Sequence, residues 1–161
     1  MNIPVAVITI SDSVAGGTRP DHSGPAVRHK LEESGYLIQS HEIVPDERKG
    51  IADLLRSLCD GGRVRAVFTT GGTGIAPRDV TPEATRDVIE REIPGLGEVM
   101  RAEGRKVVNT APLSRALAGS RGSVLVVNLP GSPRGAVESL DAIVELLPHI
   151  VDLLNGNTEH S

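Results

Sequence analysis

Short apolar runs alternate with amphipathic segments along this chain, and that alternation limits the fold to a few architectures. Strand-like apolar runs occupy residues 5–8, 64–70 and 123–129, and a weaker one occupies residues 36–44. The segments between them carry apolar residues at helical spacing. Strands that alternate with helices predict βαβ units and a mostly parallel sheet covered on both faces. The expected fold class is therefore α/β, a three-layer α/β/α sandwich with a mostly parallel sheet.

The helical segments are bounded by residues that commonly begin and end helices. The clearest helix begins near Asp46, and its apolar residues recur at i, i+3, i+4 and i+7 from Ile51. Cys59 lies on this apolar stripe, so we expect a core role for it and not a nucleophilic one. The other helices are predicted from Pro25 to the residue before Gly35, from Thr81 as N-cap to about Glu92, from Pro94 onward, and over the C-terminal segment, where Pro148 is expected to kink or split the helix.

Composition narrows the class of protein. The length of 161 residues fits one domain, predicted to span residues 1–161. No apolar run exceeds four residues, which excludes a helical membrane span of about 20 apolar residues. The N-terminal segment lacks a signal-peptide pattern, so we expect a cytoplasmic protein, and the single cysteine excludes a disulfide within the chain. The net charge of −4 and the two aromatic residues argue against a nucleic-acid partner.

Residues 69–82 form the most informative loop of the sequence. Gly71, Gly72 and Gly74 fall within four residues, and glycine lets a backbone reach φ > 0 and approach a ligand closely. Such a loop can direct amides at an anion, and a helix beginning near Pro82 can add its positive end. The pattern is neither a P-loop nor a dinucleotide fingerprint, because the required lysine and third glycine are missing. We interpret it as an anion cradle, with a plain sharp turn as the alternative.

Two aspartates are candidates for chemistry near this loop. Asp79 lies inside it, and two like charges 4 Å apart repel by about 4 kcal/mol at an effective dielectric near 20. Mg²⁺ removes such a conflict, and it typically uses one or two carboxylates together with substrate phosphates. The alternative to a metal-binding role is a structural role for each aspartate. In that alternative, Asp79 would pair with Arg78 or cap a helix, and Asp46 would be the N-cap of the helix that follows it.

Three other polar segments adjoin predicted strands. The segment 11–13 (Ser-Asp-Ser) follows the first strand and either binds a polar ligand or forms turns. Ser132 is a predicted helix N-cap after the last strand. Ser114 lies in a polar region whose structure the sequence does not indicate, and the adjacent Arg115 is expected to be a solvated charge. Ligands bind at the carboxyl ends of strands in such sheets, so these loops are expected to share one site.

Six segments together carry a recognisable signature. The most specific part combines residues 69–74 with residues 77–85, and the other blocks are residues 10–13, 44–47, 113–115 and 128–133. Taken in the order in which they occur along the chain, these blocks resemble those of the MoaB/Mog family of molybdenum-cofactor biosynthesis proteins. The resemblance runs from about Val5 to Leu154, almost the whole chain.

The resemblance implies a molybdopterin-binding type of α/β/α domain, assembled as a homotrimer or as a hexamer of two trimers. Active members are molybdopterin adenylyltransferases, which transfer AMP from Mg-ATP to the phosphate of molybdopterin and release pyrophosphate. It therefore implies a nucleotidyltransferase with Mg²⁺ as cofactor, ATP as co-substrate and a molybdate-insertion enzyme as a candidate downstream partner. The alternative is a non-catalytic molybdopterin-binding or carrier protein of the same pathway.

By motif match, the resemblance also assigns roles to individual residues. Asp46 and Asp79 fall on the catalytic acidic positions and are the candidate Mg²⁺ ligands. The expected substrate-binding and nucleotide-binding residues are Ser11, Asp12 and Ser13 in the first loop, Gly71, Gly72, Thr73 and Gly74 in the phosphate loop, Ser114 at a pterin-binding position, and Asn128, Pro130, Gly131 and Ser132 in a second ligand loop.

Overall fold

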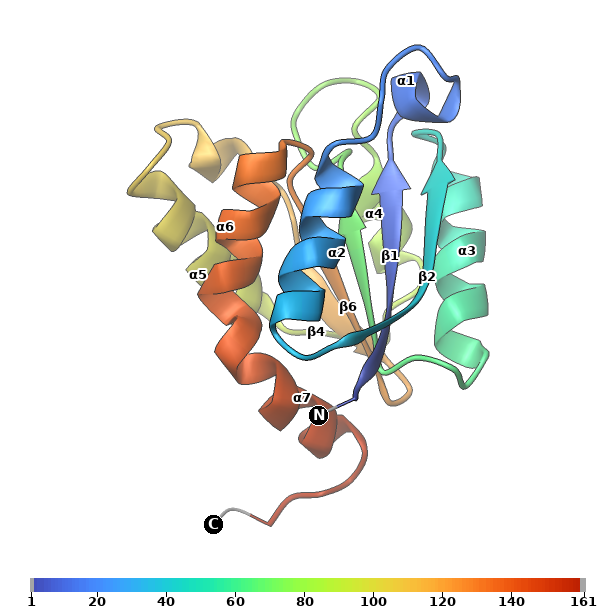
Figure 1. The fold of residues 1–161 in the computed structure, drawn as a ribbon, viewed down its shortest axis with the longest axis vertical. Helices are drawn as coiled ribbons and strands as arrows, with labels where there is room; N and C mark the ends of the chain where they lie inside the picture. The colour runs from blue at the N-terminus through green and yellow to red at the C-terminus, as the bar shows by residue number, and fades with distance from the viewer. Residues whose placement is uncertain (1, 160–161) are drawn as a thin grey trace.

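A six-stranded sheet forms the centre of the protein in the computed structural model, which describes residues 2–159 (Figure 1). The strand order is β2-β1-β3-β6-β5-β4. Strands β2, β1, β3 and β6 are parallel, and β5 and β4 complete one edge in antiparallel pairing. The strands are β1 (Pro4–Ile10), β2 (Leu37–Val44), β3 (Ala66–Thr70), β4 (Arg91–Glu92), β5 (Ala118–Arg121) and β6 (Val124–Leu129).

Helices cover both faces of this sheet, so the predicted three-layer α/β/α architecture is confirmed. One face carries α2 (Ser23–Glu33), α5 (Pro94–Arg105), α6 (Pro133–Ile143) and α7 (Leu147–Leu154), and the other carries α3 (Arg48–Asp60) and α4 (Thr81–Arg86). A short helix, α1 (Asp12–Ala15), follows β1, and two 3₁₀ turns, η1 (Ala111–Leu113) and η2 (Val144–Leu146), follow α5 and α6.

The core consists of two apolar clusters, one on each side of the sheet. Successive side chains of a strand point to opposite faces. In β1, Val5 and Val7 accordingly pack under α2 and α6, whereas Ala6 and Ile8 pack under α3. Cys59 belongs to the second cluster, and burial raises the pKa of its thiol to about 11. The expected core role of this cysteine is confirmed.

The helix predicted from Thr81 to about Glu92 is too long. Helix α4 ends at Arg86, and the two residues Arg91–Glu92 form a strand that pairs with β5. Backbone hydrogen bonds from Glu90 and Ile93 to carbonyl oxygens of the β5 region flank this pair. The backbone amides thus find their partners across the sheet, and the helical hydrogen bonds are not continued.

Two other helix boundaries depend on local residues. The helix expected from Asp46 begins at Arg48 with Glu47 as its N-cap, so Asp46 is not the cap. The C-terminal helix is divided as expected: α6 ends at Ile143, and α7 begins at Leu147 with Pro148 in its first turn. Proline has no amide hydrogen to continue a helix but fits its first turn.

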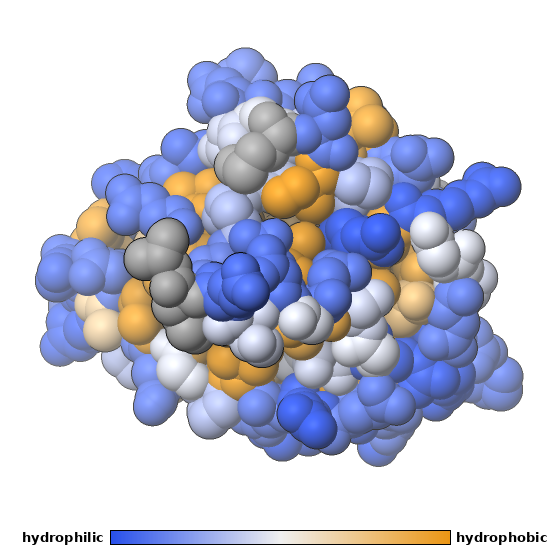
Figure 2. Space-filling view, turned by 90° about the horizontal axis from the view of Figure 1, so that it is seen from below, coloured by the Kyte–Doolittle hydropathy of each residue, from blue (hydrophilic) through white to orange (hydrophobic). Residues whose placement is uncertain are grey.

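The sheet has its topological switch point at β1 and β3. The chain leaves β1 for β2 on one side and later returns to β3 on the other, and ligands of such sheets bind outside the strand ends at this point. In Figure 1 these ends lie at the top, beside α1. Figure 2 shows the opposite end, where hydrophilic and apolar side chains are interspersed. Among residues 2–159, no helix combines the length and the apolar character that crossing a membrane requires.

Candidate functional site

The glycine loop (residues 71–74) leaves β3 at the switch point in a conformation that favours glycine. Gly71 has φ +108° and Gly72 has φ +69°, both in the left-handed region. A Cβ on Gly71 would overlap the carbonyl oxygen of Ile10 at the end of β1. A Cβ on Gly72 would overlap the hydroxyl of Thr81 and lie 3.0 Å from Oδ1 of Asp46. The loop therefore approaches its neighbours more closely than a residue with a side chain allows.

Thr81 holds the start of this loop. Its hydroxyl donates to the carbonyl of Gly71 at 2.9 Å, and its amide donates to the carbonyl of Gly72 at 3.1 Å. Thr81 is the first residue of α4, and the N-cap is Val80, which makes no side-chain cap. The predicted capping role of Thr81 is therefore wrong, because its hydroxyl satisfies the loop carbonyl instead.

Arg115 holds the end of the loop, and sequence reasoning missed this role. Its backbone amide donates to Thr73 O at 2.7 Å, and its guanidinium donates to Gly74 O and Asp79 O, both at 2.8 Å. A third contact, at 2.6 Å, reaches the Glu83 carboxylate and holds the pKa of that carboxyl below its usual range. Arg115, expected to be a solvated charge, in fact holds the loop through these contacts, which we call the Arg115 clamp. A single arginine in a polar segment gives no local signal of such contacts.

Asp46 is held by the first loop and not by the helix that follows it. The amide of Asp12 donates to Asp46 Oδ2 at 2.9 Å, and the amide of Asp46 donates to Asp12 Oδ1 at 3.0 Å. The guanidinium of Arg78 binds both oxygens of the Asp12 carboxylate, at 3.0 and 2.9 Å. Asp12 therefore joins the β1, β2 and β3 connections.

Asp79 adopts neither of its expected structural roles. Arg78 pairs with Asp12, and Asp79 is not the N-cap of α4. Its Oδ2 accepts the amide of Ala76 at 2.9 Å within a turn of the loop. Its carboxylate thus stays at the mouth of the glycine loop, where a Cβ on Gly74 would lie 2.8 Å from Oδ2.

The pKa values of Asp46 and Asp12 are shifted in opposite directions. Burial raises the pKa of Asp46 above its ordinary value, and the negative charges of Asp12 and Asp79 act in the same direction. The hydrogen bonds from Arg78 lower the pKa of Asp12 instead. Within residues 2–159 no group of three or more His, Cys, Asp or Glu side chains is arranged to hold a metal. Two carboxylates near one pocket still fit Mg²⁺, which completes its coordination with water and phosphate oxygens.

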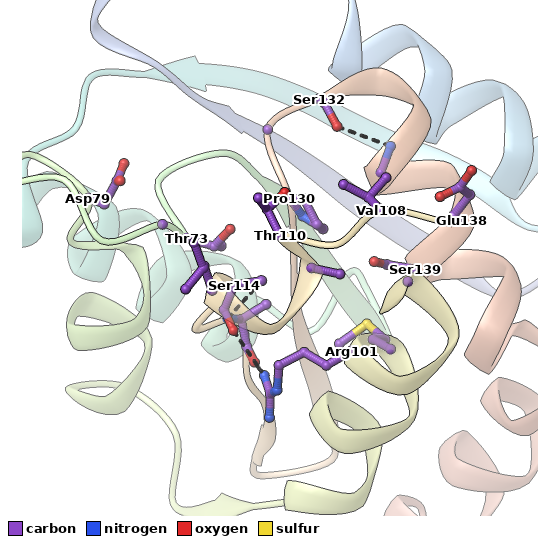
Figure 3. Close-up of a pocket in the computed structure, with 18 of the residues that line it drawn as sticks. Thr73, Asp79, Arg101, Val108, Thr110, Ser114, Pro130, Ser132, Glu138 and Ser139 are labelled. Carbon is purple, nitrogen blue, oxygen red and sulfur yellow. Dashed lines mark hydrogen bonds between the residues drawn. The ribbon is translucent and has the colours of Figure 1, made fainter. Parts of the chain in front are cut away.

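Two pockets meet at the glycine loop. The α5–α6 pocket, of about 470 Å³, lies between the loop, α5, η1 and α6 (Figure 3). The β1–α2 pocket, of about 640 Å³, lies between the first loop, the start of α2 and the β2–α3 connection. Four residues line both pockets: Gly72, Asp79, Gly131 and Ser132. Ser132 is the confirmed N-cap of α6, because its hydroxyl accepts the amide of Gly135 at 3.1 Å.

The expected site residues divide between these pockets. Ser11, Asp12, Ser13, Asp46 and Gly71 line the β1–α2 pocket, and Thr73, Gly74, Ser114 and Pro130 line the α5–α6 pocket. Asn128 lines neither. Its buried side chain donates to the hydroxyls of Thr69 and Thr85 at 3.1 and 3.0 Å and accepts the amide of Leu117. Its contacts position the strand and helix behind the site.

Comparison with known proteins identifies the family of this chain. Residues 6–149 match the family model described as "Probable molybdopterin binding domain", and the chain belongs to this family. A molybdopterin adenylyltransferase of Helicobacter pylori (strain J99) is 44% identical over 159 residues, which cover 96% of this chain and 89% of that protein.

Solved structures of the family share the fold over nearly the whole chain. The crystal structure of the molybdopterin biosynthesis enzyme MoaB from Thermus thermophilus superposes with a TM-score of 0.90 at 45% identity, covering 96% of this chain and 97% of that one. A structure of MogA superposes with a TM-score of 0.89 at 34% identity, covering 94% of this chain and 99% of that one. The predicted membership of the MoaB/Mog family is confirmed.

Proposed function

We propose that this protein is a molybdopterin adenylyltransferase, which transfers AMP from ATP to the phosphate of molybdopterin in molybdenum cofactor biosynthesis. Family membership and the relatives named for this activity support the proposal. One structural observation carries it further. Asp46 and Asp79 come from different connections of the sheet and line one polar pocket beside the glycine loop, whose other side borders a second pocket. A glycine loop that borders two pockets suits an enzyme whose two substrates must react with each other.

The two pockets provide for two substrates. Molybdopterin enters the α5–α6 pocket, where Ser114 lies and where the walls include Met100 and Val108. ATP enters the β1–α2 pocket, lined by polar groups of the segment 11–13 and by Asp46. The phosphates then approach each other at the glycine loop. Holding two reactants in attack geometry is itself a large part of catalysis in phosphoryl-type transfers.

The chain's own groups position and stabilise the reacting phosphates. An oxygen of the molybdopterin phosphate attacks the α-phosphorus of ATP, the bond from that phosphorus to the bridging oxygen breaks, and pyrophosphate leaves. Backbone amides of residues 72–74 and the positive end of α6 would face the developing charge, whereas the Gly71 amide donates to Leu129 O. Asp46 and Asp79 would hold Mg²⁺, whose charge offsets the repulsion between the two anionic substrates.

The direct experiment supplies purified protein with molybdopterin, ATP and Mg²⁺ and measures adenylylated molybdopterin and pyrophosphate. We expect both products in equal amounts. Omitting molybdopterin should abolish pyrophosphate release, which controls for ATP hydrolysis. Binding of molybdopterin without any product would instead identify a carrier protein of the pathway. The homotrimer, the cytoplasmic location and a downstream molybdate-insertion enzyme stay predictions that rest on the family resemblance.

A further inference from the structure

A buried polar cluster lies beneath the start of α2, and the transfer step described above gives it no role. The hydroxyl of Thr9 donates to Asp21 Oδ2 at 2.7 Å and lies 2.8 Å from Nε2 of His41. The amide of Gly24 donates to the other carboxylate oxygen, Asp21 Oδ1, at 2.9 Å. The side chains of Asp21 and His41 are each 12% exposed. We call Thr9, Asp21, Gly24 and His41 the Thr9 cluster.

The Thr9 cluster joins three elements because strand geometry directs its members to one face of the sheet. Thr9 follows Val5 and Val7 at every second position of β1, and those two valines pack under α2. His41 is the partner of Val7 in the parallel register of β1 and β2, so it lies on the same face. Asp21 lies two residues before α2. The cluster therefore connects β1, β2 and the start of α2.

The hydrogen atoms of the cluster can be assigned from its chemistry. An ionised aspartate only accepts, and a threonine hydroxyl has one hydrogen to donate. That hydrogen goes to Asp21, so the contact with His41 requires Nε2–H to donate to Thr9 Oγ1. Burial lowers the pKa of His41, an effect that the charge of Asp21 opposes and that of Arg28 reinforces, so the ring is neutral at pH 7. The neutral ring then carries its single hydrogen on Nε2.

Gly24 brings the backbone of α2 directly against the cluster. A Cβ at this position would overlap Oγ1 of Thr9, Oδ2 of Asp21 and Cε1 of His41. Gly24 is itself buried, so the start of the helix rests on the cluster without an intervening side chain. Removing one of these hydrogen bonds leaves a buried group unpaired, and a displacement of the chain before α2 would relieve that cost.

The connection between β1 and α2 (residues 11–22) is one wall of the pocket proposed for ATP. Its residues 11–14 and 19–22 line that pocket. The first part of the connection is tied to the β2–α3 connection by the two hydrogen bonds between Asp12 and Asp46. The last part is tied to the sheet by the Thr9 cluster. The position of this wall therefore depends on contacts at both of its ends.

We propose that His41 and Thr9 are positioning residues that act through Asp21, hold the last part of this wall against the ATP pocket and so determine the affinity for ATP. His41 lies outside the pocket lining, and its Nε2–H fixes the direction in which the Thr9 hydroxyl donates. That hydroxyl and the Gly24 amide hold the two oxygens of the Asp21 carboxylate. A wall that is ordered before ATP binds saves the cost of ordering it on binding. The inference rests on the proposed function, which places ATP in this pocket.

Two substitutions of Thr9 test the inference. Thr9→Val keeps the shape of the side chain and removes the hydroxyl, so Asp21 and His41 both lose their shared partner. We expect about a tenfold rise in the KM for ATP and in the Kd from calorimetric titration with ATP, with kcat and the affinity for molybdopterin within about threefold of the parent. Thr9→Ser retains the hydroxyl and should stay within about threefold of the parent in every constant. A hydroxyl that served stability alone would not separate KM from kcat.

Two substitutions of His41 test the donor. His41→Leu removes the N–H and should weaken ATP binding as much as Thr9→Val, and it replaces that variant if Thr9→Val does not fold. His41→Gln retains an N–H donor and should recover most of the affinity. The NMR shifts of the ring nitrogens in the ATP-free parent should show hydrogen on Nε2. Val27→Ala, a buried position of α2 outside both pockets, is the stability control and should keep the KM for ATP.

The outcomes separate this inference from the proposed function. ATP affinity within threefold of the parent in a folded Thr9→Val or His41→Leu protein overturns the inference, and so does a parent ring with its hydrogen on Nδ1. Equal loss of affinity in Val27→Ala also overturns it, because stability of α2 would then explain the effect. A parent that binds ATP but transfers no AMP refutes the enzymatic activity, and the calorimetric constants still decide the role of His41. A parent that binds no ATP refutes both.

Discussion

At the residue scale, the contacts of Arg78 and Asp12 leave the carboxylates of Asp46 and Asp79 available to bind a metal ion. Arg78 binds the Asp12 carboxylate through two hydrogen bonds, and Asp12 in turn holds the backbone of Asp46. Asp79 is left with one short contact, to the amide of Ala76. The two carboxylates proposed for Mg²⁺ are thus positioned through their backbones and turns. Neither forms an ion pair with an arginine among residues 2–159, and both line the pocket proposed for ATP.

Asp79→Asn tests the catalytic role of this carboxylate. The amide keeps the shape and can still accept the Ala76 amide, so the free energy of unfolding should change by about 1 kcal/mol or less. Loss of the charge should remove about 3–4 kcal/mol of transition-state stabilisation, a rate loss of about 10²–10³. Molybdopterin binding without ATP should survive. Asp53→Asn, in an exposed pair on α3, is the matched control. Transfer within threefold of the parent would leave Asp79 a structural residue.

The raised pKa of Asp46 makes the transfer rate begin to fall at a higher pH than an ordinary aspartate would cause. Burial raises this pKa, so the carboxyl takes up its proton at a higher pH than an ordinary aspartate, and activity that needs the carboxylate falls as pH drops through the raised value. The positive charge of Arg78 opposes the shift. Arg78→Gln should therefore move the acid limb of kcat/KM to higher pH. Arg48→Gln, which breaks a similar exposed pair with Asp87, should leave the limb in place. An acid limb that moves to lower pH in Arg78→Gln contradicts the assignment.

At the scale of elements, the glycine loop is held between Thr81 at its start and Arg115 at its end. The first contact comes from α4, and the second comes from the segment between η1 and β5. Arginine suits the second position because its planar guanidinium can bind two carbonyls and a carboxylate at once. The loop can therefore keep the conformation in which it lies between the two pockets.

Arg115→Lys should show that this clamp positions the loop. Lysine keeps the charge but cannot bridge Gly74 O, Asp79 O and Glu83 together, so kcat should fall at least tenfold while ATP still binds. Glu83→Gln leaves the two carbonyl contacts intact and should stay within threefold of the parent. Arg121→Lys changes an arginine with the same kind of contacts, to Asp60 and Val88 O, outside both pockets and controls for stability. If Arg121→Lys loses as much kcat as Arg115→Lys, the clamp has no specific role.

Gly72→Ala should separate backbone strain from close approach. An alanine at φ +69° is strained by about 1–2 kcal/mol, and here its Cβ also overlaps the Thr81 hydroxyl and crowds Asp46. Gly62 has a similar φ of +73° in open space, so Gly62→Ala carries the strain alone. Gly72→Ala should therefore lose more stability than Gly62→Ala in denaturant titrations, and only Gly72→Ala should bind ATP at least tenfold more weakly. Equal ATP affinities in the two variants would refute the cradle.

At the scale of the whole molecule, the elements predicted from sequence are those with local signals. Short apolar runs bounded by turn residues marked β1, β3 and β6, and helical spacing marked α3. The β4–β5 edge was not predictable, because Arg91–Glu92 is short and polar and becomes a strand only through its partner at residues 119–120. Site contacts such as Arg78 with Asp12, 66 residues apart, have the same origin. Motif resemblance located the loops of the site, whereas the folded chain determines which side chains hold them.

Assembly is the last expectation, and the exposed apolar side chains indicate where to test it. Ile75, Val108 and Leu113 are 69%, 43% and 51% exposed, and all three line the α5–α6 pocket. Exposed apolar side chains at a pocket mark either a ligand groove or a subunit interface, and the double variant below tests the second alternative. Light scattering at micromolar concentration should give three times the chain mass of 16.9 kDa. The double variant Ile75→Ser with Leu113→Ser should lower the mass toward a monomer, whereas Leu37→Ser, 52% exposed on the edge strand β2, should not. A monomeric parent would contradict the trimer, and a trimeric double variant would place its interface elsewhere.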